Sequence, residues 1–471
     1  MKKPIMMSAA LVALGMYSCK KNSDEKVNIS EPQFEAGQTI SSDTLKGSVK
    51  GTMQSGKTYY FDGAVTINQG DTLVMQSGVK LLALSPNAVL LVKGSFVSLG
   101  TSDQPNWITG VDAYKNPSNY KHTDPNEDPN NDPAFKPSGK LWGGIQCDAT
   151  CPLLDIKWTH LDFAGGNVGS NPLPGYKQGD DLFVILFQNP DGYMILEDSW
   201  VYGSTTDATR VKGGHIHIMR NTVEKLAYND GDCFNVKSST DGDMAYNLII
   251  GTAKGGTKAS NKGGGARQTN INMYNNTFIN GGWRSVDPDR GANLNFEEGA
   301  RGKAYNNIMV NCKTGLRILE NPIADTANLA YGYNLSYGDS LSVVDEIYPL
   351  GHITIPQPTD IPDPATFYPG YPNSYTLGQA YQAPGIVGKN NPMFVNYPLP
   401  QTAQHLRDIT FQGNYDFHLK GSSPGIGKGY TGFTPLNTTA PVDNKYLKAT
   451  VTPPNKDLGA FPTDGNGNKH K

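Results

Sequence analysis

Four basic side chains in the middle of the chain are of types that can move protons or hold acid groups. They are His217, Lys237, Arg301 and Arg317. Imidazole and a desolvated lysine amine can accept a proton near neutral pH. A guanidinium can hold a carboxylate through two parallel hydrogen bonds. These four side chains are therefore candidates for base catalysis and for neutralising an acidic ligand.

A second group of polar side chains in the same region could contact such a ligand: Lys212, His215, Asn270, Asn272 and Lys303. Asp241 and Asp243 stand two residues apart in STDGDM, so their carboxylates could hold calcium through oxygen ligands. The segment has no closing glutamate of a calcium-binding loop, and a plain turn is the alternative interpretation. Rows of this composition are also typical of any solvated face of a sheet.

A repeated element must position these residues. Asn276 in INMYNNTFIN aligns with five similar positions, which succeed one another at intervals of 23 to 31 residues: Asp198, Asn221, Asn247, Asn307 and Asn334. Self-similarity at this period is typical of stacked-repeat proteins. Asparagine suits a corner between strands, because its amide can bond main-chain groups of neighbouring repeats.

The residues before each aligned position alternate between apolar and polar, which is the period of a strand. The positions expected to face inward include Tyr193 and Ile195, Ile216 and Ile218, and Ile271 and Met273. A second strand is expected about ten residues upstream, at Val211, at Phe234 and Val236, and at Leu294 and Phe296. The sequence therefore predicts an all-β parallel solenoid whose coils hold two or three strands, with long loop excursions. The glycine-rich stretch 251–268 is expected to interrupt one coil as a loop.

The chain divides into six predicted parts. Residues 1–19 have a basic start and an apolar run that ends in Ser18 and Cys19, typical of a secretory signal. Residues 20–43 are a flexible tether, and 44–345 form the β-helix with N-terminal cap coils. Residues 346–410 are a proline- and tyrosine-rich excursion, 411–462 a final coil and C-terminal segment, and 463–471 a frayed tail.

Several stretches carry a family resemblance: VLLVKGSFVSLGTSDQPNWITG, LWGGIQCD, the YNN repeats, GANLNFEEGARGKAYNNIMVNCKTGLRI and YDFHLKGSSPGIGKG. Over residues 44–461 the chain resembles the right-handed parallel β-helix lipoproteins of Bacteroidetes, which share the pectin-lyase-like fold. The resemblance implies a right-handed, single-stranded parallel β-helix. The end of the signal resembles a lipobox, which implies that Cys19 is acylated and anchors the protein to the outer membrane, on its periplasmic side or at the cell surface.

The resemblance also implies a function that involves an extracellular polysaccharide. Uronate lyases of this fold remove a proton next to a carboxylate, so His217 or Lys237 would be the base, and Arg301, Arg317 or a calcium ion would neutralise the acid. A glycoside hydrolase would instead need two carboxylates, for which Asp241, Asp243 and Glu297 are available. A non-catalytic adhesin or structural surface protein is the further alternative.

Bulk properties leave few other function classes. The formal net charge of -3 gives no electrostatic footprint for nucleic acid. The glycine-rich stretch lacks the spacing of a nucleotide-binding loop. Besides Cys19 there are four cysteines, at 147, 151, 233 and 312, and their pairing stays open.

Overall fold

The computed structural model describes residues 38–117, 140–167, 173, 175–227, 230–285, 290–318, 322–347, 387–399, 415–436 and 449–470. The predicted signal with Cys19, most of the tether and most of the predicted excursion 346–410 lie outside these ranges. In the described part, no helix is long and apolar enough to cross a membrane.

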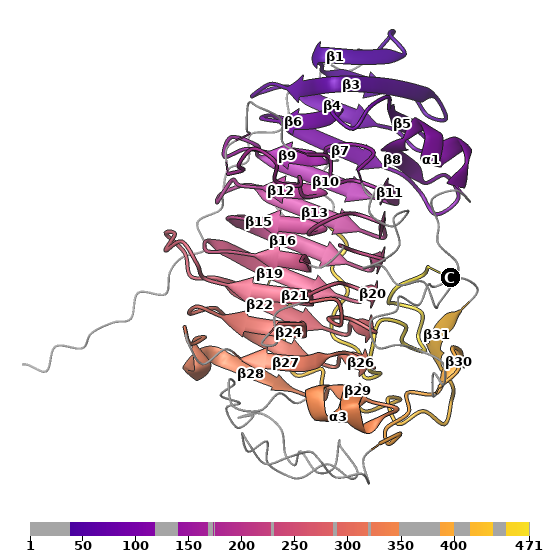
Figure 1. Cartoon of the computed structure of the whole chain (residues 1–471), viewed down its shortest axis with the longest axis vertical. Coiled ribbons are helices and arrows are strands. Elements are labelled where there is room, and N and C mark those ends of the chain that lie inside the picture. Colours follow the sequence, from indigo (N-terminus) through magenta and orange to yellow (C-terminus); the bar gives the residue numbers. More distant parts are fainter. Residues whose placement is uncertain are drawn as a thin grey trace, which may run out of the picture.

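The fold is a parallel β-helix built from stacked coils (Figure 1). One of its sheets has ten strands, each in parallel register with the next. They are β2 (Gly51–Met53), β4 (Thr72–Met75), β7 (Ser95–Leu99), β10 (Leu153–Lys157), β13 (Tyr193–Glu197), β16 (Gly214–Met219), β19 (Thr240–Ala245), β22 (Asn270–Tyr274), β25 (Arg301–Tyr305) and β28 (Leu329–Gly332).

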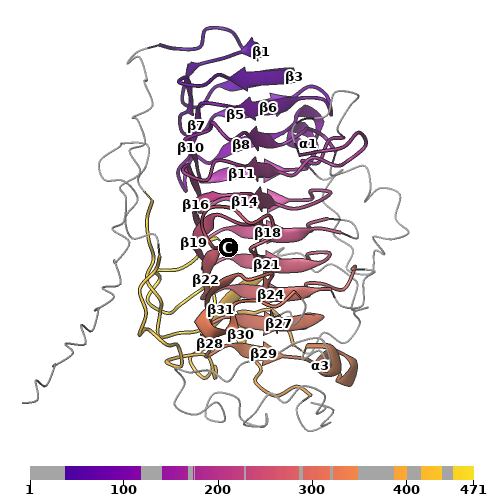
Figure 2. The same cartoon turned by 90° about the vertical axis from the view of Figure 1, so that its left-hand side faces the viewer.

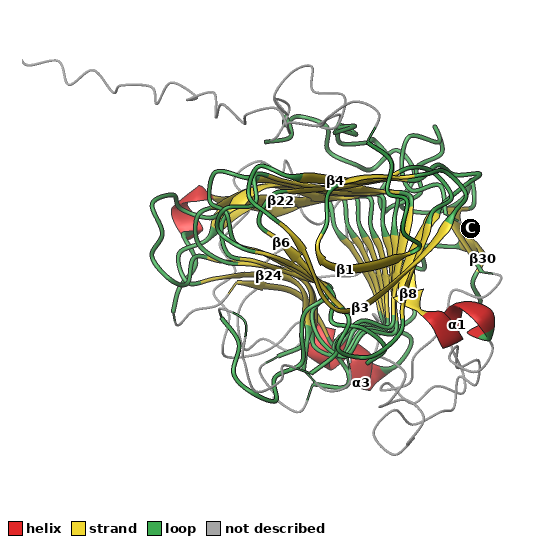
Figure 3. Cartoon of the chain, turned by 90° about the horizontal axis from the view of Figure 1, so that it is seen from above, coloured by secondary structure: helices red, strands yellow, loops and turns green. Residues whose placement is uncertain are grey.

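Two further rows of parallel strands complete each coil. The first contains β5 (Lys80–Ala83), β8 (Asn106–Gly110), β11 (Thr159–Asp162), β14 (Trp200–Tyr202), β17 (Thr222–Glu224), β20 (Leu248–Ile250), β23 (Thr277–Ile279), β26 (Ile308–Val310) and β29 (Leu335–Tyr337). The second contains β6 (Val89–Val92), β9 (Ile145–Cys147), β12 (Ile185–Phe187), β15 (Thr209–Val211), β18 (Asp232–Val236), β21 (Gly255–Ser260), β24 (Ala292–Glu297) and β27 (Thr314–Ile318). Seen from above, the three rows enclose the core (Figure 3).

The remaining elements lie at the ends and corners of the stack. β1 (Thr44–Ser48) pairs with β3 (Thr58–Ile67), which is long enough to pair with both β5 and β6. α1 (Val111–Lys115) follows β8, η2 (Thr326–Asn328) precedes β28, and α3 (Leu341–Ile347) follows β29. β30 (Phe394–Asn396) and β31 (Asp416–Leu419) form a separate antiparallel pair.

A ladder of asparagines lines one corner of the coils and confirms the predicted repeat. Asn276 accepts hydrogen bonds at its Oδ1 from the backbone N and the Nδ2 of Asn247, both at 3.0 Å, and its own Nδ2 donates to the carbonyl of Met244. The same pattern links Asn221 to Asn247 and Asn307 to Asn334. Every amide in the ladder is buried, so each coil satisfies the polar groups of its neighbour.

The left-handed residue at this corner is the one before each ladder asparagine. Asn275 and Asn306 have φ values of 51° and 63°, and Tyr246 has 57°. Asparagine tolerates this conformation, whereas a tyrosine there needs its surroundings to hold it. The ladder position itself is therefore selected by its hydrogen bonds rather than by its backbone angles.

One predicted register differs from the structure. The ladder residue of the earliest aligned coil is Ser199, whose backbone N donates to Asn221 Oδ1 at 3.0 Å, and not Asp198. Consequently Met194 and Leu196 face the core, while Tyr193 and Ile195 face outward. The one-residue slip reversed the predicted sides of β13, because side chains alternate along a strand.

The C-terminal part differs from the prediction as well. Residues 415–419 do not form a final coil, since β31 pairs antiparallel with β30. Residues 463–470 are not frayed: Asn468 and His470 are buried, and Asn468 Nδ2 donates to the carbonyl of Asn221 at 3.0 Å. Figure 2 shows the yellow C-terminal segment lying along the stack beside β19 and β22.

Candidate functional site

Two of the three outward faces of the coils carry C-terminal residues. Ala449, Val451 and Phe433 pack on the outside of the ten-stranded sheet. Phe394, Phe417, Leu419, Leu458 and Phe461 pack on β20, β23, β26 and β29. The third face is the outside of β15, β18, β21, β24 and β27. We refer to it as the Lys237 face.

A buried carboxylate forms the centre of the Lys237 face. Glu297 Oε1 lies 2.8 Å from Lys258 Nζ, and its Oε2 lies 3.2 Å from Arg290 and 3.4 Å from Arg317. Burial alone would raise the pKa of Glu297, but the nearby cations, Lys258 first, lower it to about 2. Glu297 is therefore ionised at neutral pH and neutralises part of the surrounding positive charge.

A second acidic group, Asp232 and Asp207, lies two and three coils from Glu297 toward the N-terminus. Asp207 Oδ2 accepts from Arg210 Nε at 2.7 Å and from Asn235 Nδ2 at 3.2 Å. Asn235 also donates to Asp232 Oδ2 at 2.9 Å. Burial is the main reason that the pKa of Asp207 is raised. Arg210 lies 4.4 Å from the centre of the Phe183 ring, so an aromatic wall borders this end of the face.

Lys237 differs from the other cations on this face. It directly follows β18, is half-buried, and makes no ion pair or hydrogen bond through its ammonium within the described residues. Burial first, and then the charges of Lys258 and Arg210, lower its pKa to about 8 against the opposing effect of Glu297 and Asp232. A substantial fraction of Lys237 is thus a free amine in mildly alkaline solution, as a general base requires.

Lys212 lies beside Lys237 on the preceding coil. Val211 is the register partner of Val236, and Lys237 N donates to the carbonyl of Val211 at 2.8 Å, so the two lysines follow in matched positions. Burial, and then Arg210, lowers the pKa of Lys212. Its ammonium also has no ion-pair partner in the part of the chain that the structure describes.

The carboxylates of this face are poorly placed for glycoside hydrolysis. Lys258 Nζ lies 2.8 Å from Glu297 Oε1 and 3.7 Å from Asp232 Oδ2, so it stands between the two acid groups. A hydrolase needs that space for the scissile bond. Asp241 and Asp243, the other predicted carboxylates, lie on β19 in the ten-stranded sheet. The structure does not bring them together with Glu297.

Several predicted site residues lie beneath the C-terminal segment, by which we mean the described residues 433–436 and 449–470. His217 is 2% exposed, and its Nε2 lies 3.0 Å from Glu197 Oε1 and 3.4 Å from the carbonyl of Thr450. Asp243 Oδ1 accepts from Asn272 Nδ2 at 3.1 Å and from the backbone N of Leu436 at 3.1 Å. These three side chains belong to the packing between the segment and the sheet.

The other predicted residues on the ten-stranded sheet stay closer to solvent. His215 Nδ1 lies 3.0 Å from Asp241 Oδ2, and Arg267 Nε lies 3.5 Å from Asp241 Oδ1. Asn270, Arg301 and Lys303 follow on the next two strands in register. Of the four candidate catalytic residues, the structure therefore places Lys237 and Arg317 on one face and His217 and Arg301 on another. Within the described residues, no group of three or more His, Cys, Asp or Glu side chains could hold a metal ion.

Sequence reasoning missed several residues of the Lys237 face. Lys258 stands in the glycine-rich stretch predicted as a loop, but residues 255–260 form β21 in register with β18 and β24. Its Gly-Gly-Thr-Lys-Ala-Ser sequence hides the alternation, although Thr257 and Ala259 face inward and Lys258 outward. Arg290 and Asp207 lie in loops, where no periodicity could have marked them.

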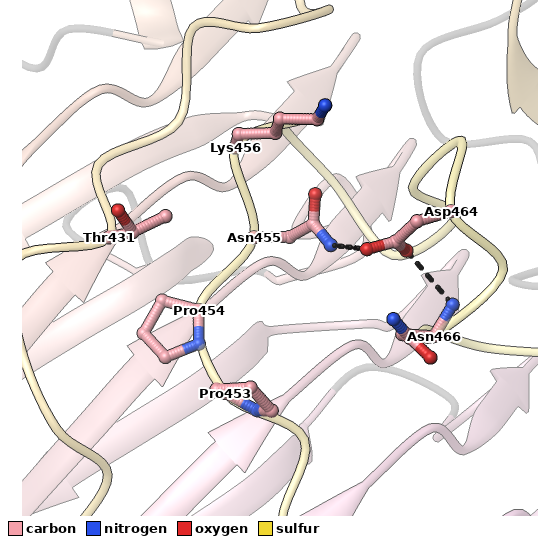
Figure 4. A pocket seen from close by; sticks show the side chains of 7 residues that line it. All are labelled: Thr431, Pro453, Pro454, Asn455, Lys456, Asp464 and Asn466. Atoms are coloured by element: carbon pink, nitrogen blue, oxygen red, sulfur yellow. Dashed lines mark hydrogen bonds between the residues drawn. The ribbon is translucent and has the colours of Figure 1, made fainter.

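The remaining candidates lie away from this face. A cavity of about 360 Å³ is lined by Thr431, Pro453, Pro454, Asn455, Lys456, Asp464 and Asn466 (Figure 4). Its Asn455 amide is bonded to Asp464 at 2.7 Å, which holds two parts of the C-terminal segment together. Cys147, Cys151, Cys233 and Cys312 are free thiols and fully buried.

Comparison with protein families, with curated proteins and with solved structures gives no match. The class to which the chain belongs is therefore defined by its fold. It is a parallel β-helix with two faces packed by C-terminal residues and a third that carries a row of charged side chains.

Proposed function

We propose that this protein binds and cleaves an acidic extracellular polysaccharide on the Lys237 face, by elimination, with Lys237 as the base. The observation that carries the proposal is the half-buried Lys237 amine, which has no ionic partner within the described residues and stands among cations that could hold an acid group. A lysine base must be neutral at working pH, and burial beside Lys258 and Arg210 favours that state.

The bonds that form and break belong to Lys237, the substrate and water. The Lys237 amine takes the proton on the carbon next to the substrate carboxylate, and the electron pair forms a double bond as the bond to the leaving sugar oxygen breaks. The leaving oxygen then takes a proton from the Lys237 ammonium or from water. One glycosidic bond is lost and one unsaturated uronate end is formed, so atoms and charges balance.

The charged side chains of the Lys237 face also extend over several coils. Adjacent coils are spaced by about 4.8 Å, the distance between neighbouring strands. This spacing is similar to the length of one sugar residue. A chain laid along the stack could thus contact side chains on successive coils, from Lys212 on the coil of β15 to Arg317 in β27. Carboxylates at regular intervals along the ligand would suit this row.

The cellular setting of the proposal comes from the sequence. The lipobox-like end of the signal, and the resemblance to Bacteroidetes β-helix lipoproteins, support acylation of Cys19 and an outer-membrane location facing the periplasm or the cell exterior. Calcium remains a proposed cofactor. Asp241 and Asp243 are its sequence-derived ligands, and a chelator added to the assay tests whether turnover depends on it.

A panel of acidic and neutral glycans tests the proposed activity. The protein without residues 1–19 should generate ultraviolet-absorbing unsaturated products from a uronate polymer but not from a neutral one. Lys237→Gln should abolish turnover. Lys237→Arg should do the same while it keeps the positive charge, because a guanidinium does not give up its proton at working pH. Undiminished turnover by Lys237→Arg would remove Lys237 from the role of base.

A non-catalytic glycan-binding or adhesive protein is the second candidate. It is favoured by the pairing of the other cations on this face, since Lys258, Arg290 and Arg317 all contact Glu297. In that case Lys237→Arg would bind uronate polymers as well as the wild type does, and neither protein would release unsaturated ends.

A further inference from the structure

The family resemblance implies Arg317, Arg301 or calcium for the neutralising role, and the positions of the two arginines make both unsuitable partners for Lys237. Arg317 lies 3.4 Å from Glu297 and 3.2 Å from Asn295, and it shares the Glu297 carboxylate with Lys258 and Arg290. It also lies three coils from Lys237, a distance of about 14 Å at the usual strand spacing. Arg301 lies on the ten-stranded sheet. Neither can reach an acid group on the sugar that Lys237 deprotonates.

Lys212, by contrast, lies close to Lys237 and has no ion-pair partner within the described residues. It stands one coil from Lys237, in matched register and on the same side of the strand row. Like charges placed side by side on neighbouring strands destabilise a sheet. The other cations facing this pair, Arg210 and Lys258, are bonded to Asp207 and Glu297. Within the described residues, neither Lys212 nor Lys237 has an ion-pair partner, whereas these two neighbouring cations do.

A loop backbone approaches Lys212 closely. A Cβ built on Gly175 would lie 2.8 Å from Lys212 Nζ, so the loop backbone passes directly beside the ammonium. Gly175 has a φ of 91°, a conformation that glycine adopts without strain. A larger residue would be strained there and would press on the amine. The loop backbone thus borders the Lys212 ammonium, and the described acid groups of the loop, Asp180 and Asp181, bond Lys177 N and Lys140 instead.

The geometry points to Lys212 as the residue that binds the carboxylate of the sugar whose neighbouring proton Lys237 removes. This inference rests on the proposed function and names its substrate class: a polymer of uronic acids with free carboxylates at the cleavage site. Lys212 stays protonated and stabilises the extra negative charge that develops on the carboxylate as the proton leaves. The proton and electron transfers are those given above, and Lys212 takes part in none of them.

Kinetics on a uronate polymer and on its methyl ester test this role. Lys212→Gln should lower kcat/KM on the free acid by about 100-fold, as loss of one group that stabilises developing charge does. The loss on the neutral ester should be much smaller, so the preference of the enzyme for the acid should disappear. Lys80→Gln is the matched control: Lys80 is a half-buried lysine on β5 whose Nζ, among the described residues, donates to the Gly56 carbonyl alone, at 3.5 Å, and its loss should change neither rate.

The outcomes separate this inference from the proposed function. If the wild type cleaves the polymer and Lys212→Gln keeps the full preference for acid over ester, Lys212 is not the carboxylate site, while the lyase function stands. If the wild type cleaves no acidic glycan, the proposed function fails. Calorimetry with a uronate oligomer then decides on Lys212: weaker binding by Lys212→Gln but not by Lys80→Gln supports an anion site there, and equal binding overturns it.

Discussion

The imidazole of His470 stacks on the indole of Trp200, with ring centres 3.9 Å apart and planes 13° from parallel. Trp200 in turn stacks on His160, and His160 on Trp107, at 4.2 and 3.6 Å. His470 occupies the next step of this ring column, above Thr222, whose Oγ1 lies 2.9 Å from its Nδ1. A residue next to the C-terminus thus continues a column that three coils of the solenoid begin.

Replacing His470 with alanine should loosen the C-terminal segment. We expect a loss of about 1–2 kcal/mol in the free energy of unfolding, from the ring contact and the hydrogen bond to Thr222. Urea denaturation measures the loss, and limited proteolysis should show faster cleavage within 449–470. His418→Ala, at a side chain that is 39% exposed, should have a smaller effect on both. Equal sensitivity of the two variants would mean that the ring column does not fasten the segment.

Replacing Asn276 with alanine should cost much more. The substitution leaves the backbone N and the Nδ2 of Asn247 and the carbonyl of Met244 without their bonds, all in a buried corner. Each stranded group costs about 1–3 kcal/mol, so we expect a loss of at least about 3 kcal/mol. Chemical denaturation measures it. Asn270→Ala on the same coil is the control, and a comparable loss there would contradict a special role for the ladder.

Glu197 should make the C-terminal segment sensitive to acid. Burial favours its neutral form, yet His217, Lys157 and Arg220 lower its pKa to about 2. A carboxyl group whose pKa is lowered by folding stabilises the fold at pH values above its pKa in the unfolded chain, near 4.3. It loses that contribution as the pH falls toward 2. The contribution is on the order of 3 kcal/mol.

Glu197 Oε1 also accepts a hydrogen bond from the backbone N of Thr450 at 2.7 Å. The C-terminal segment should therefore loosen over the same pH range. Denaturation midpoints measured between pH 5 and 2 should fall more steeply for the wild type than for Glu197→Gln. Parallel curves would contradict the prediction.

Lys237 should show a conflict between activity and stability. Its pKa of about 8 lies below the value near 10.4 of an unfolded lysine, so the folded state binds fewer protons between these values. Stability should therefore rise with pH over this range. Lys237→Met should be more stable than the wild type at pH 7, by about 1–2 kcal/mol, because it removes a half-buried charge that has no partner among the described residues.

The activity of the wild type should change in the same pH range. Turnover should rise with pH through about 8 as the amine is freed, with Lys258, Arg210, Glu297, Asp232 and Lys212 as the charged groups around it. Initial rates across pH 6 to 10 measure the profile. A rate that is flat through pH 8 would contradict Lys237 as the base.

The fold could be predicted because a solenoid repeats its signal. Asn276 and its equivalents recur with the same flanking alternation, and this places most strands of the ten-stranded sheet. The signal weakened in the coil whose ladder residue is Ser199, because this residue takes the ladder position without being an asparagine. It was lost at β21, where Thr257 and Ala259 stand in place of the larger apolar residues of the neighbouring strands.

The site could be predicted only in part, for a physical reason. Alternation identifies outward residues such as His217 and Lys237 equally well, but it does not indicate what covers them. His217 is buried by Thr450, a contact between residues far apart in the sequence that has no periodic signature. Lys237 lies on the face to which the described C-terminal residues do not contribute a packed cluster.

The asparagine ladder gives the stack a direction of assembly. The Oδ1 atoms that satisfy the buried donors of one coil belong to the coil that follows it, as Asn247 depends on Asn276 and Asn276 on Asn307. A chain that folds from its N-terminal end would expose an incomplete corner until each next coil forms. Residues 449–470 would then bind across coils that are already formed and fix their alignment.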